Sequence, residues 1–110
     1  MNIQNISTKT IETRVVGVTY DGRQAVVAQL REEESVLLVR DPRNPFDHNA
    51  IKVVRQDGQQ IGFLDRYLAA ELASQLDYYG RLVKAVVLAL TGGYYEGSSL
   101  GVVVQCEIPN

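Results

Sequence analysis

Short apolar segments separated by short links recur along this chain of 110 residues, and this pattern limits its possible folds more than any other feature of the sequence. Six segments are rich in the β-branched and aromatic residues that favour strands, and they cover residues 13–20, 35–40, 49–56, 59–64, 81–90 and 100–108. Most links between them are of hairpin length, whereas parallel neighbours need long crossover connections. The pattern therefore predicts an antiparallel sheet. The run SVLLVR at 35–40 is continuously apolar, which predicts a strand buried on both faces.

The clearest helix is predicted over residues 66–79. Its apolar residues fall on one stripe, at Leu68, Leu72, Leu76 and Tyr79. Asp65 precedes this segment as an N-cap, and Gly80 follows it in the position of a C′ glycine. We therefore expect a helix whose leucine stripe packs on the strands.

A second, shorter helix is predicted over residues 22–31, where Asp21 and Gln24 stand in the positions of a capping box. The resulting order is β-α-β-β-β-α-β-β. It predicts an α+β, mainly β fold, in which a small, barrel-like antiparallel sheet of about six strands is plugged on one side by a helix. Residues 1–10 are polar and lack periodicity, so they are expected to form a flexible arm before a single domain at 11–110.

Composition limits the class of protein further. Apolar residues make up 45% of the chain and charged residues 22%, as in soluble globular domains, and no run has the length of a membrane span. The N-terminus does not resemble a secretory signal, and one cysteine, Cys106, suits a reducing compartment, so we expect a cytoplasmic protein. The net charge of −2 excludes a broad basic face for duplex DNA. Any nucleic-acid site must be small and depend on a few arginines.

Residues suited to catalysis are scarce. One histidine, His48, and one cysteine cannot form a zinc site of the usual kind, and no GxSxG segment accompanies His48. No P-loop or GxGxxG segment occurs, so nucleotide chemistry has no support. Asp41 and Asp47 offer a pair of oxygen donors, but the other groups of a nuclease-like metal site are not evident. We expect neither an enzyme nor a cofactor.

The segment RDPRNPFDHNAIKV, residues 40–53, is longer and more polar than a hairpin requires. Pro42 and Pro45 stiffen it, and a rigid loop loses little entropy when it binds a ligand. Within five residues stand a cation, an amide, an aromatic ring and a carboxylate, at Arg43, Asn44, Phe46 and Asp47. These groups suit the phosphate, the unpaired base and the sugar hydroxyl of a nucleic-acid strand.

The same loop also has a purely structural interpretation. In it Phe46 fills the barrel, while Asp47 and Asn49 cap the turn as Asx residues often do. The residues alone leave both interpretations open. In either case the loop from Pro42 to Asn49 should be ordered, with Asn44 or Asn49 bonding backbone groups.

RDPRNPFDHNAIKV and the following DGQQIGFLDRYLAAELASQLD closely resemble the HIRAN domain. In that family a strand leads into an R-x-P-x-N-P-[FY]-D-x-N-A-[IV] loop, a hairpin ending in G-[YFH]-L and a helix rich in LA. RVVGVTYDG also resembles the family's first strand, so the similarity covers residues 14–108. It implies an OB-like, partly open β-barrel, with residues 11–110 forming one HIRAN-like domain. The family occurs in Swi/Snf-type helicases and as small bacterial proteins, and this chain resembles the latter.

From the helicase members, the resemblance implies binding of single-stranded DNA at a free 3′-hydroxyl end. Asn44, Phe46 and Asp47 match the end-binding loop, where Asp47 would accept a hydrogen bond from the terminal hydroxyl. Further positions that face the DNA are matched by Tyr20, Phe63 and Arg66. The chain departs from the eukaryotic DNA binder at Thr19, where that protein has an arginine, and at Asp21, where it has an aromatic residue. This departure predicts binding that is weaker by about 1 kcal/mol or more.

Two functions follow as hypotheses. The first is a nucleic-acid-binding module in DNA repair or stalled-fork processing, whose partners are the end of single-stranded DNA, or of RNA, and a repair helicase or nuclease. The alternative is a non-catalytic protein-interaction or structural module that has lost DNA-end binding. It is favoured by the net negative charge and by the tyrosine pairs of LDYYG and GGYYEG, because adjacent tyrosines point in different directions and some must be exposed.

Overall fold

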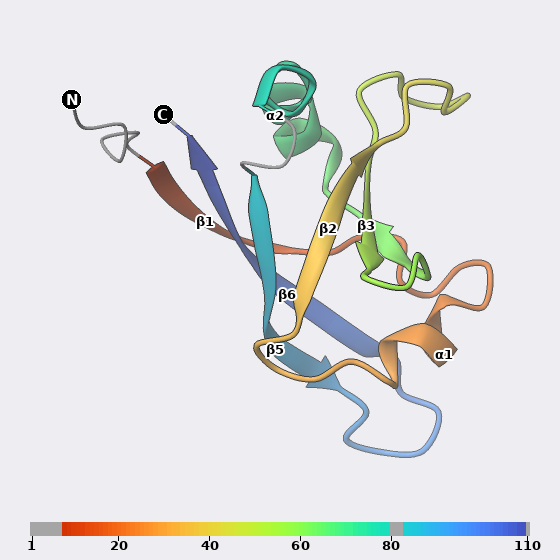
Figure 1. Ribbon diagram of the computed structural model, residues 1–110. Coiled ribbons are helices and arrows are strands. Elements are labelled where there is room, and N and C mark those ends of the chain that lie inside the picture. Colours follow the sequence, from red (N-terminus) through yellow and green to blue (C-terminus); the bar gives the residue numbers. More distant parts are fainter. Residues whose placement is uncertain (1–7, 80–82, 110) are drawn as a thin grey trace.

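The computed structural model describes residues 8–79 and 83–109, which form six strands and two helices. In chain order the elements are β1 (Thr8–Arg14), α1 (Arg23–Val27), β2 (Ser35–Arg40), β3 (Ile51–Arg55), β4 (Gln60–Phe63), α2 (Arg66–Tyr79), β5 (Lys84–Gly92) and β6 (Leu100–Pro109). The strands make one antiparallel sheet in the order β1-β6-β5-β2-β3-β4. The sheet curls into a half-barrel with α2 above its open side and α1 at its lower end (Figure 1). The predicted α+β, mainly β fold is confirmed.

The two edges of the sheet meet at a single point. Val16, just after β1, and Phe63 in β4 exchange two backbone hydrogen bonds of 2.8 and 2.9 Å. This approach requires Gly62, because a Cβ there would collide with the carbonyl oxygen of Val16 and lie 2.7 Å from Val15 Cγ1. The glycine of the QQIGFL segment therefore lets the barrel close and places Phe63 at the closure.

The core lies on the concave face of the sheet. Its fully buried side chains come mainly from the strands, and the largest are Ile51, Ile61, Leu72, Ile108, Val27, Val53, Val87, Val102, Val104 and Cys106. Contrary to expectation, β2 is not buried on both faces: Val36 and Leu38 face the core, whereas Leu37 and Val39 are each 42% exposed. Residues alternate between the faces of a strand, and within residues 8–79 and 83–109 the outer face of β2 is left partly exposed, so an apolar run can still be half exposed.

The first strand lies earlier in the chain than its β-branched run predicts. Residues 8–10, assigned to the flexible arm, belong to β1, which pairs along its whole length with β6. Most residues of β1 are polar and exposed, and only Ile11 and Thr13 are partly buried, so its composition resembles that of an arm. The chain leaves the sheet at Gly17, whose φ is +71°, and Tyr20 lies in a turn rather than at a strand end. The remainder of the predicted arm, residues 1–7, lies outside the described residues.

The helix α1 is shorter than predicted, and its capping box is wrong. The N-cap is Gly22, with no side-chain hydrogen bond, because Asp21 and Gly22 both adopt positive φ values of 54° and 75°. Gln24 instead ties α1 to β6. Its amide nitrogen donates to the carbonyl oxygens of Val18 and Leu100, and its amide oxygen accepts from the Leu100 N–H at 2.8 Å.

The helix α2 begins and ends as predicted. Oδ1 of Asp65 accepts hydrogen bonds from the N–H groups of Tyr67 and Leu68 at 2.8 and 3.0 Å, so the predicted N-cap is confirmed. Leu72 and Leu76 are buried, and Leu68 packs against the core while partly exposed. Gly80 and the side chain of Tyr79 lie outside the described residues. Within residues 8–79 and 83–109, no helix is long and apolar enough to span a bilayer.

We expect Leu72→Ala to lower the free energy of unfolding by about 2–5 kcal/mol, because it removes a buried side chain and leaves a cavity between α2 and the sheet. Chemical denaturation measures this change. Glu71→Ala, at an exposed position on the same helix, is the control and should change stability by less than about 0.5 kcal/mol. A loss below about 1 kcal/mol for Leu72→Ala would show that α2 is peripheral.

Cys106 should behave as a buried hydrophobe. Burial raises the pKa of its thiol to about 11, whereas the unfolded thiol ionises at lower pH. The stability that this shift contributes is fully present below about pH 9 and is lost as the pH rises to about 11. The difference in unfolding free energy between the wild type and Cys106→Ala should therefore shrink over that range. A thiol that alkylates at the same rate in native and unfolded protein at neutral pH would contradict this.

Candidate functional site

The loop between β2 and β3 is closed at its base by backbone hydrogen bonds. The N–H of Asp41 donates to the carbonyl oxygen of Ala50 at 2.9 Å, and the N–H of Ala50 donates to that of Asp47 at 3.0 Å. Arg40, the last residue of β2, binds both the loop and α2. Its guanidinium donates to the carbonyl oxygens of Ala50 and His48 and to the carboxylate of Asp77 at 3.1 Å. The first residue of the RDPRNPFDHNAIKV segment thus fixes the loop against the helix.

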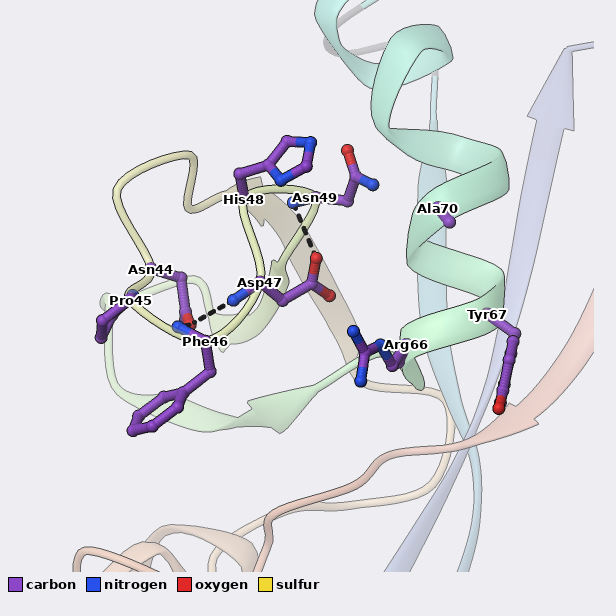
Figure 2. A pocket seen from close by; sticks show the side chains of 9 residues that line it. All are labelled: Asn44, Pro45, Phe46, Asp47, His48, Asn49, Arg66, Tyr67 and Ala70. Carbon is purple, nitrogen blue, oxygen red and sulfur yellow. Dashed lines mark hydrogen bonds between the residues drawn. The ribbon is translucent and has the colours of Figure 1, made fainter.

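Asn44 holds the tip of the loop. Its side-chain oxygen accepts hydrogen bonds from the N–H groups of Phe46 and Asp47 at 2.9 and 3.2 Å, and its amide nitrogen donates to the Asp41 carboxylate at 3.1 Å. The prediction that an asparagine of this loop bonds backbone groups is therefore confirmed at Asn44. These bonds set the direction in which the side chains of Phe46 and Asp47 leave the backbone (Figure 2).

The structural interpretation of the loop predicted that Asp47 caps the turn and that Phe46 fills the barrel, and only the first of these is found. Oδ1 of Asp47 accepts the N–H of Asn49 at 2.9 Å, so this carboxylate does cap the turn. Within the described residues, its second oxygen takes part in no hydrogen bond. Phe46 does not fill the barrel, because its side chain is 90% exposed and points away from the helix (Figure 2). The structure thus presents a free carboxylate oxygen and an uncovered aromatic ring on one anchored loop.

Two hollows flank Asp47. One, of about 460 Å³, lies between the loop and α2 and is lined by Asn44 to Asn49 together with Arg66, Tyr67 and Ala70. The other, of about 240 Å³, adds Val16, Ala50, Phe63 and Leu64 to Phe46, Asp47 and Arg66. The guanidinium of Arg66 faces the Asp47 carboxylate in Figure 2, yet it forms no ion pair with any described residue. Both hollows therefore offer one carboxylate and one uncommitted cation.

A third hollow, of about 600 Å³, also has Phe46 in its lining. We call it the aromatic hollow, because its lining includes three aromatic rings beside charged and polar groups, at Gly17, Tyr20, Asp21, Arg23, Asp41, Asn44, Pro45, Phe46, Lys52, Gln60 and Phe63. Phe46 and Asn44 line all three hollows. The three hollows therefore meet at the loop between β2 and β3.

The residues expected at the site are brought together with one exception. Those that line at least one of the three hollows are Tyr20, Asn44, Phe46, Asp47, Phe63 and Arg66. Tyr20 reaches the site from a turn, and Phe63 from the closure of the barrel. Arg43 is exposed but lines none of them.

Three polar side chains of the aromatic hollow were not named in the sequence analysis, those of Arg23, Lys52 and Gln60. Lys52 lies opposite Phe63 in the β3–β4 register, so the hairpin at Asp57-Gly58 could have pointed to it. Arg23 comes from α1, and no local pattern relates that helix to the loop. The cation of Arg23 lies 5.2 Å from the centroid of the Phe63 ring, within reach of a cation–π interaction.

The chemistry available at this site is that of binding. Exposed rings can stack on planar groups, a fixed carboxylate oxygen can accept a hydrogen bond, and the cations can neutralise an anion. Within the part of the chain that the structure describes, no group of three or more His, Cys, Asp or Glu residues is arranged to hold a metal ion.

Comparison with known proteins gives consistent matches. The HIRAN domain model matches residues 8–104. Helicase-like transcription factor of Oryctolagus cuniculus is 38% identical over 78 residues, which are 71% of this chain but 7% of that protein. An Arabidopsis thaliana protein, described as a putative SWI/SNF-related matrix-associated actin-dependent regulator of chromatin subfamily A member 3-like 1, is 36% identical over 74 residues, or 66% of this chain and 8% of that protein. The chain thus spans less than a tenth of these relatives.

Solved structures agree with this. The crystal structure of the HIRAN domain of human HLTF has a TM-score of 0.67 and 30% identity, covering 90% of this chain and 74% of that chain. A crystal structure of a protein from Lactobacillus plantarum has a TM-score of 0.66 and 26% identity, covering 92% of this chain and 99% of that one. With a family match that runs from the start of β1 into β6, the chain belongs to the HIRAN domain family.

Proposed function

We propose that this protein binds single-stranded nucleic acid, preferably DNA, at a free 3′-hydroxyl end, and that it does so as a non-catalytic module in DNA repair or in the processing of stalled forks. The HIRAN domain is a nucleic-acid-binding module found in helicase-like transcription factor. Its preference for an end and the pathway it serves are the parts that we propose for this chain. A repair helicase or nuclease is the proposed protein partner.

One observation carries the proposal. Phe46 is 90% exposed although the backbone on both sides of it is fixed by hydrogen bonds to Asn44. Exposing a large ring to water is unfavourable unless another group covers it, and the hydrogen-bonded backbone fixes the direction in which the Phe46 side chain leaves the loop. Bases stack on such rings with about 1–3 kcal/mol per base, whatever the sequence of the strand.

The Asp47 carboxylate supports recognition of the strand end. Its Oδ1 is occupied by the N–H of Asn49, which orients the group and leaves the second oxygen for a ligand. A 3′-hydroxyl can donate to that oxygen in a charge-assisted hydrogen bond, worth about 1.5–3 kcal/mol. A 3′-phosphate cannot donate when it is fully ionised, and its charge would oppose that of the carboxylate. The same atom therefore favours one kind of end and disfavours the other.

Arg66 supplies a neighbouring cation that carries no information about the end. It lines both hollows beside Asp47 and has no ionic partner among the described residues. Phosphate contacts position a strand, whereas contacts to the groups that differ between ligands provide selectivity. We assign phosphate binding to Arg66 and end selectivity to Asp47. The exposed Arg43 is proposed as a more distant contact to the strand.

A protein-interaction module is the second candidate, and the exposed tyrosines favour it. Tyr78 on α2, and Tyr94 and Tyr95 in the link between β5 and β6, are each more than 70% exposed. Tyrosine is enriched at protein interfaces because it combines an apolar ring with a hydrogen-bonding group. This candidate predicts that changes at the tyrosines affect partner binding while changes at Phe46 and Asp47 do not.

We expect Asp47→Asn to weaken binding of a short 3′-hydroxyl strand by about tenfold or more while leaving binding of a 3′-phosphate strand unchanged or slightly tighter. The amide keeps the shape of the carboxylate but removes its charge. Fluorescence anisotropy with strands that differ only in the terminal group, and with a circular strand, measures the ratio.

Asp57→Asn is the matched control. Oδ1 of Asp57 accepts the N–H of Gln59 at 3.0 Å, so it caps the β3–β4 hairpin as Asp47 caps its own loop, yet it lines none of the three hollows. Its variant should bind both strands as the wild type does. Equal affinity of the wild-type protein for both ends would refute the role of Asp47, and no binding at micromolar concentration and low salt would favour the interaction module.

Arg66→Ala should weaken binding of all strands by the same factor and reduce the slope of log affinity against log salt by about 0.7, as expected for the loss of one phosphate contact. The measurement is a salt titration with each strand. Arg31→Ala, at an exposed position away from the hollows, is the control, and Arg43→Ala should have a smaller effect than Arg66→Ala. A loss confined to hydroxyl-ended strands would show that Arg66 instead acts at the terminus.

A further inference from the structure

An ion pair at the rim of the aromatic hollow joins a fixed cation to an exposed carboxylate. Nη2 of Arg23 lies 3.3 Å from Oδ2 of Asp21. The two side chains are covered very differently, because that of Arg23 is 13% exposed and that of Asp21 is 82% exposed. The arginine is thus part of the wall of the hollow, and the aspartate reaches it from solvent.

Two contacts other than that with Asp21 hold the Arg23 guanidinium in place. Its Nη1 donates to the carbonyl oxygen of Gly17 at 2.9 Å, and its guanidinium carbon lies 5.2 Å from the centroid of the Phe63 ring. A Cβ at Gly17 would lie 3.3 Å from that Nη1, so the glycine gives the arginine its room. A guanidinium held in this way loses little conformational entropy when it binds an anion.

Asp21, by contrast, is a replaceable partner. It sits in a left-handed turn, with φ values of 54° at Asp21 and 75° at Gly22, which directs its side chain back toward Arg23. Exposed ion pairs contribute about 0–1 kcal/mol, because water and salt compete with them. An anion that makes further contacts in the hollow can therefore displace this carboxylate.

The rest of the aromatic hollow is suited to a strand of nucleic acid. Lys52 adds a second cation, and the carboxylate of Asp41 is already bonded to Asn44. Tyr20, Phe46 and Phe63 present aromatic rings beside these charges, and Phe46 belongs to the same loop as Asp47. Rings alternating with cations bind the bases and phosphates of single strands.

We propose that Arg23 binds a phosphodiester of the strand whose end lies at Asp47, and that Asp21 occupies Arg23 in the free protein and competes with this phosphate. The inference rests on the proposed function and adds to it a second site and a built-in competitor. Arg23, in α1, also supplies a cation four residues after Thr19, the position at which the resemblance places an arginine in the eukaryotic DNA binder.

The first test is Asp21→Asn. Asparagine is tolerated in the left-handed region as aspartate is, so the turn should be kept while Arg23 is released. We expect a 3′-hydroxyl strand of deoxythymidines to bind about two- to fivefold more tightly, with a salt slope steeper by up to about 0.7. Glu12→Gln removes the same charge from an exposed position on β1 that lines none of the hollows, and it should change neither quantity.

The second test removes the cation. Arg23→Gln should weaken binding about tenfold or more, Arg23→Lys should restore part of the loss, and adding Asp21→Asn to Arg23→Gln should have no further effect. Thermal unfolding checks that each variant is folded. If Arg23→Gln does not fold, Arg23→Lys takes its place in the comparison that follows.

The third test identifies the phosphate. Strands carry one uncharged methylphosphonate linkage at the first, second or third position from the 3′ end. At one of these positions the substitution should weaken wild-type binding and leave the binding of the Arg23 variant unchanged.

The outcomes separate the inference from the function on which it rests. If the wild type prefers the 3′-hydroxyl to the 3′-phosphate, but Asp21→Asn matches Glu12→Gln and the Arg23 variants bind normally, the inference is wrong and the proposed function stands. If the wild-type protein binds no strand, both are wrong.

Discussion

The side-chain amide of Asn44 is the constraint on which the site depends. Its oxygen accepts hydrogen bonds from the N–H groups of Phe46 and Asp47, and its nitrogen donates to the Asp41 carboxylate. These side-chain bonds take the place of backbone hydrogen bonds, because Pro42 and Pro45 have no N–H to donate. The ring of Phe46 can then remain exposed in a set direction, and the carboxylate of Asp47 can be oriented by Asn49 alone. Without Asn44, the N–H groups of Phe46 and Asp47 would lose their hydrogen-bond acceptor, and the loop tip would be held only by the bonds at its base.

The remainder of the fold serves to bring other elements to this loop. Arg40 joins the loop to α2, which carries Arg66, while Gly62 permits the contact that closes the barrel and positions Phe63. The charge of the whole chain is negative, so the cations at the site act locally. Attraction between the protein and a strand should therefore be short-ranged and lost readily as salt increases. This suits the proposed binding of a strand end rather than of a long stretch of nucleic acid.

The sequence was sufficient for the elements whose signals are local. Asp65 and the leucine stripe predict the helix α2. Asp57-Gly58 predicts the β3–β4 hairpin, in which Gly58 has a φ of +91°. The strand β1 was misplaced because its stability comes from pairing with β6, nearly a hundred residues away.

The same distinction holds for the site. The residues of the loop were foreseen because they are contiguous in a motif that resembles a known family, and Asn44 performs the hydrogen bonding expected of it. Arg23 was not foreseen, because a capping box suggested a different turn before α1 and no local signal connects that turn to Phe63. What a residue contacts across the barrel depends on closure of the sheet, which the sequence does not reveal.

The central claim is that a strand end lies between Phe46, Asp47 and Arg66, and nuclear magnetic resonance tests it most directly. On titration with a trinucleotide ending in a 3′-hydroxyl, we predict that the largest shifts occur at the amide of Asn49 and the ring of Phe46, and that a 3′-phosphate reduces both. Shifts confined to the tyrosines between β5 and β6, or identical shifts with both ends, would contradict it.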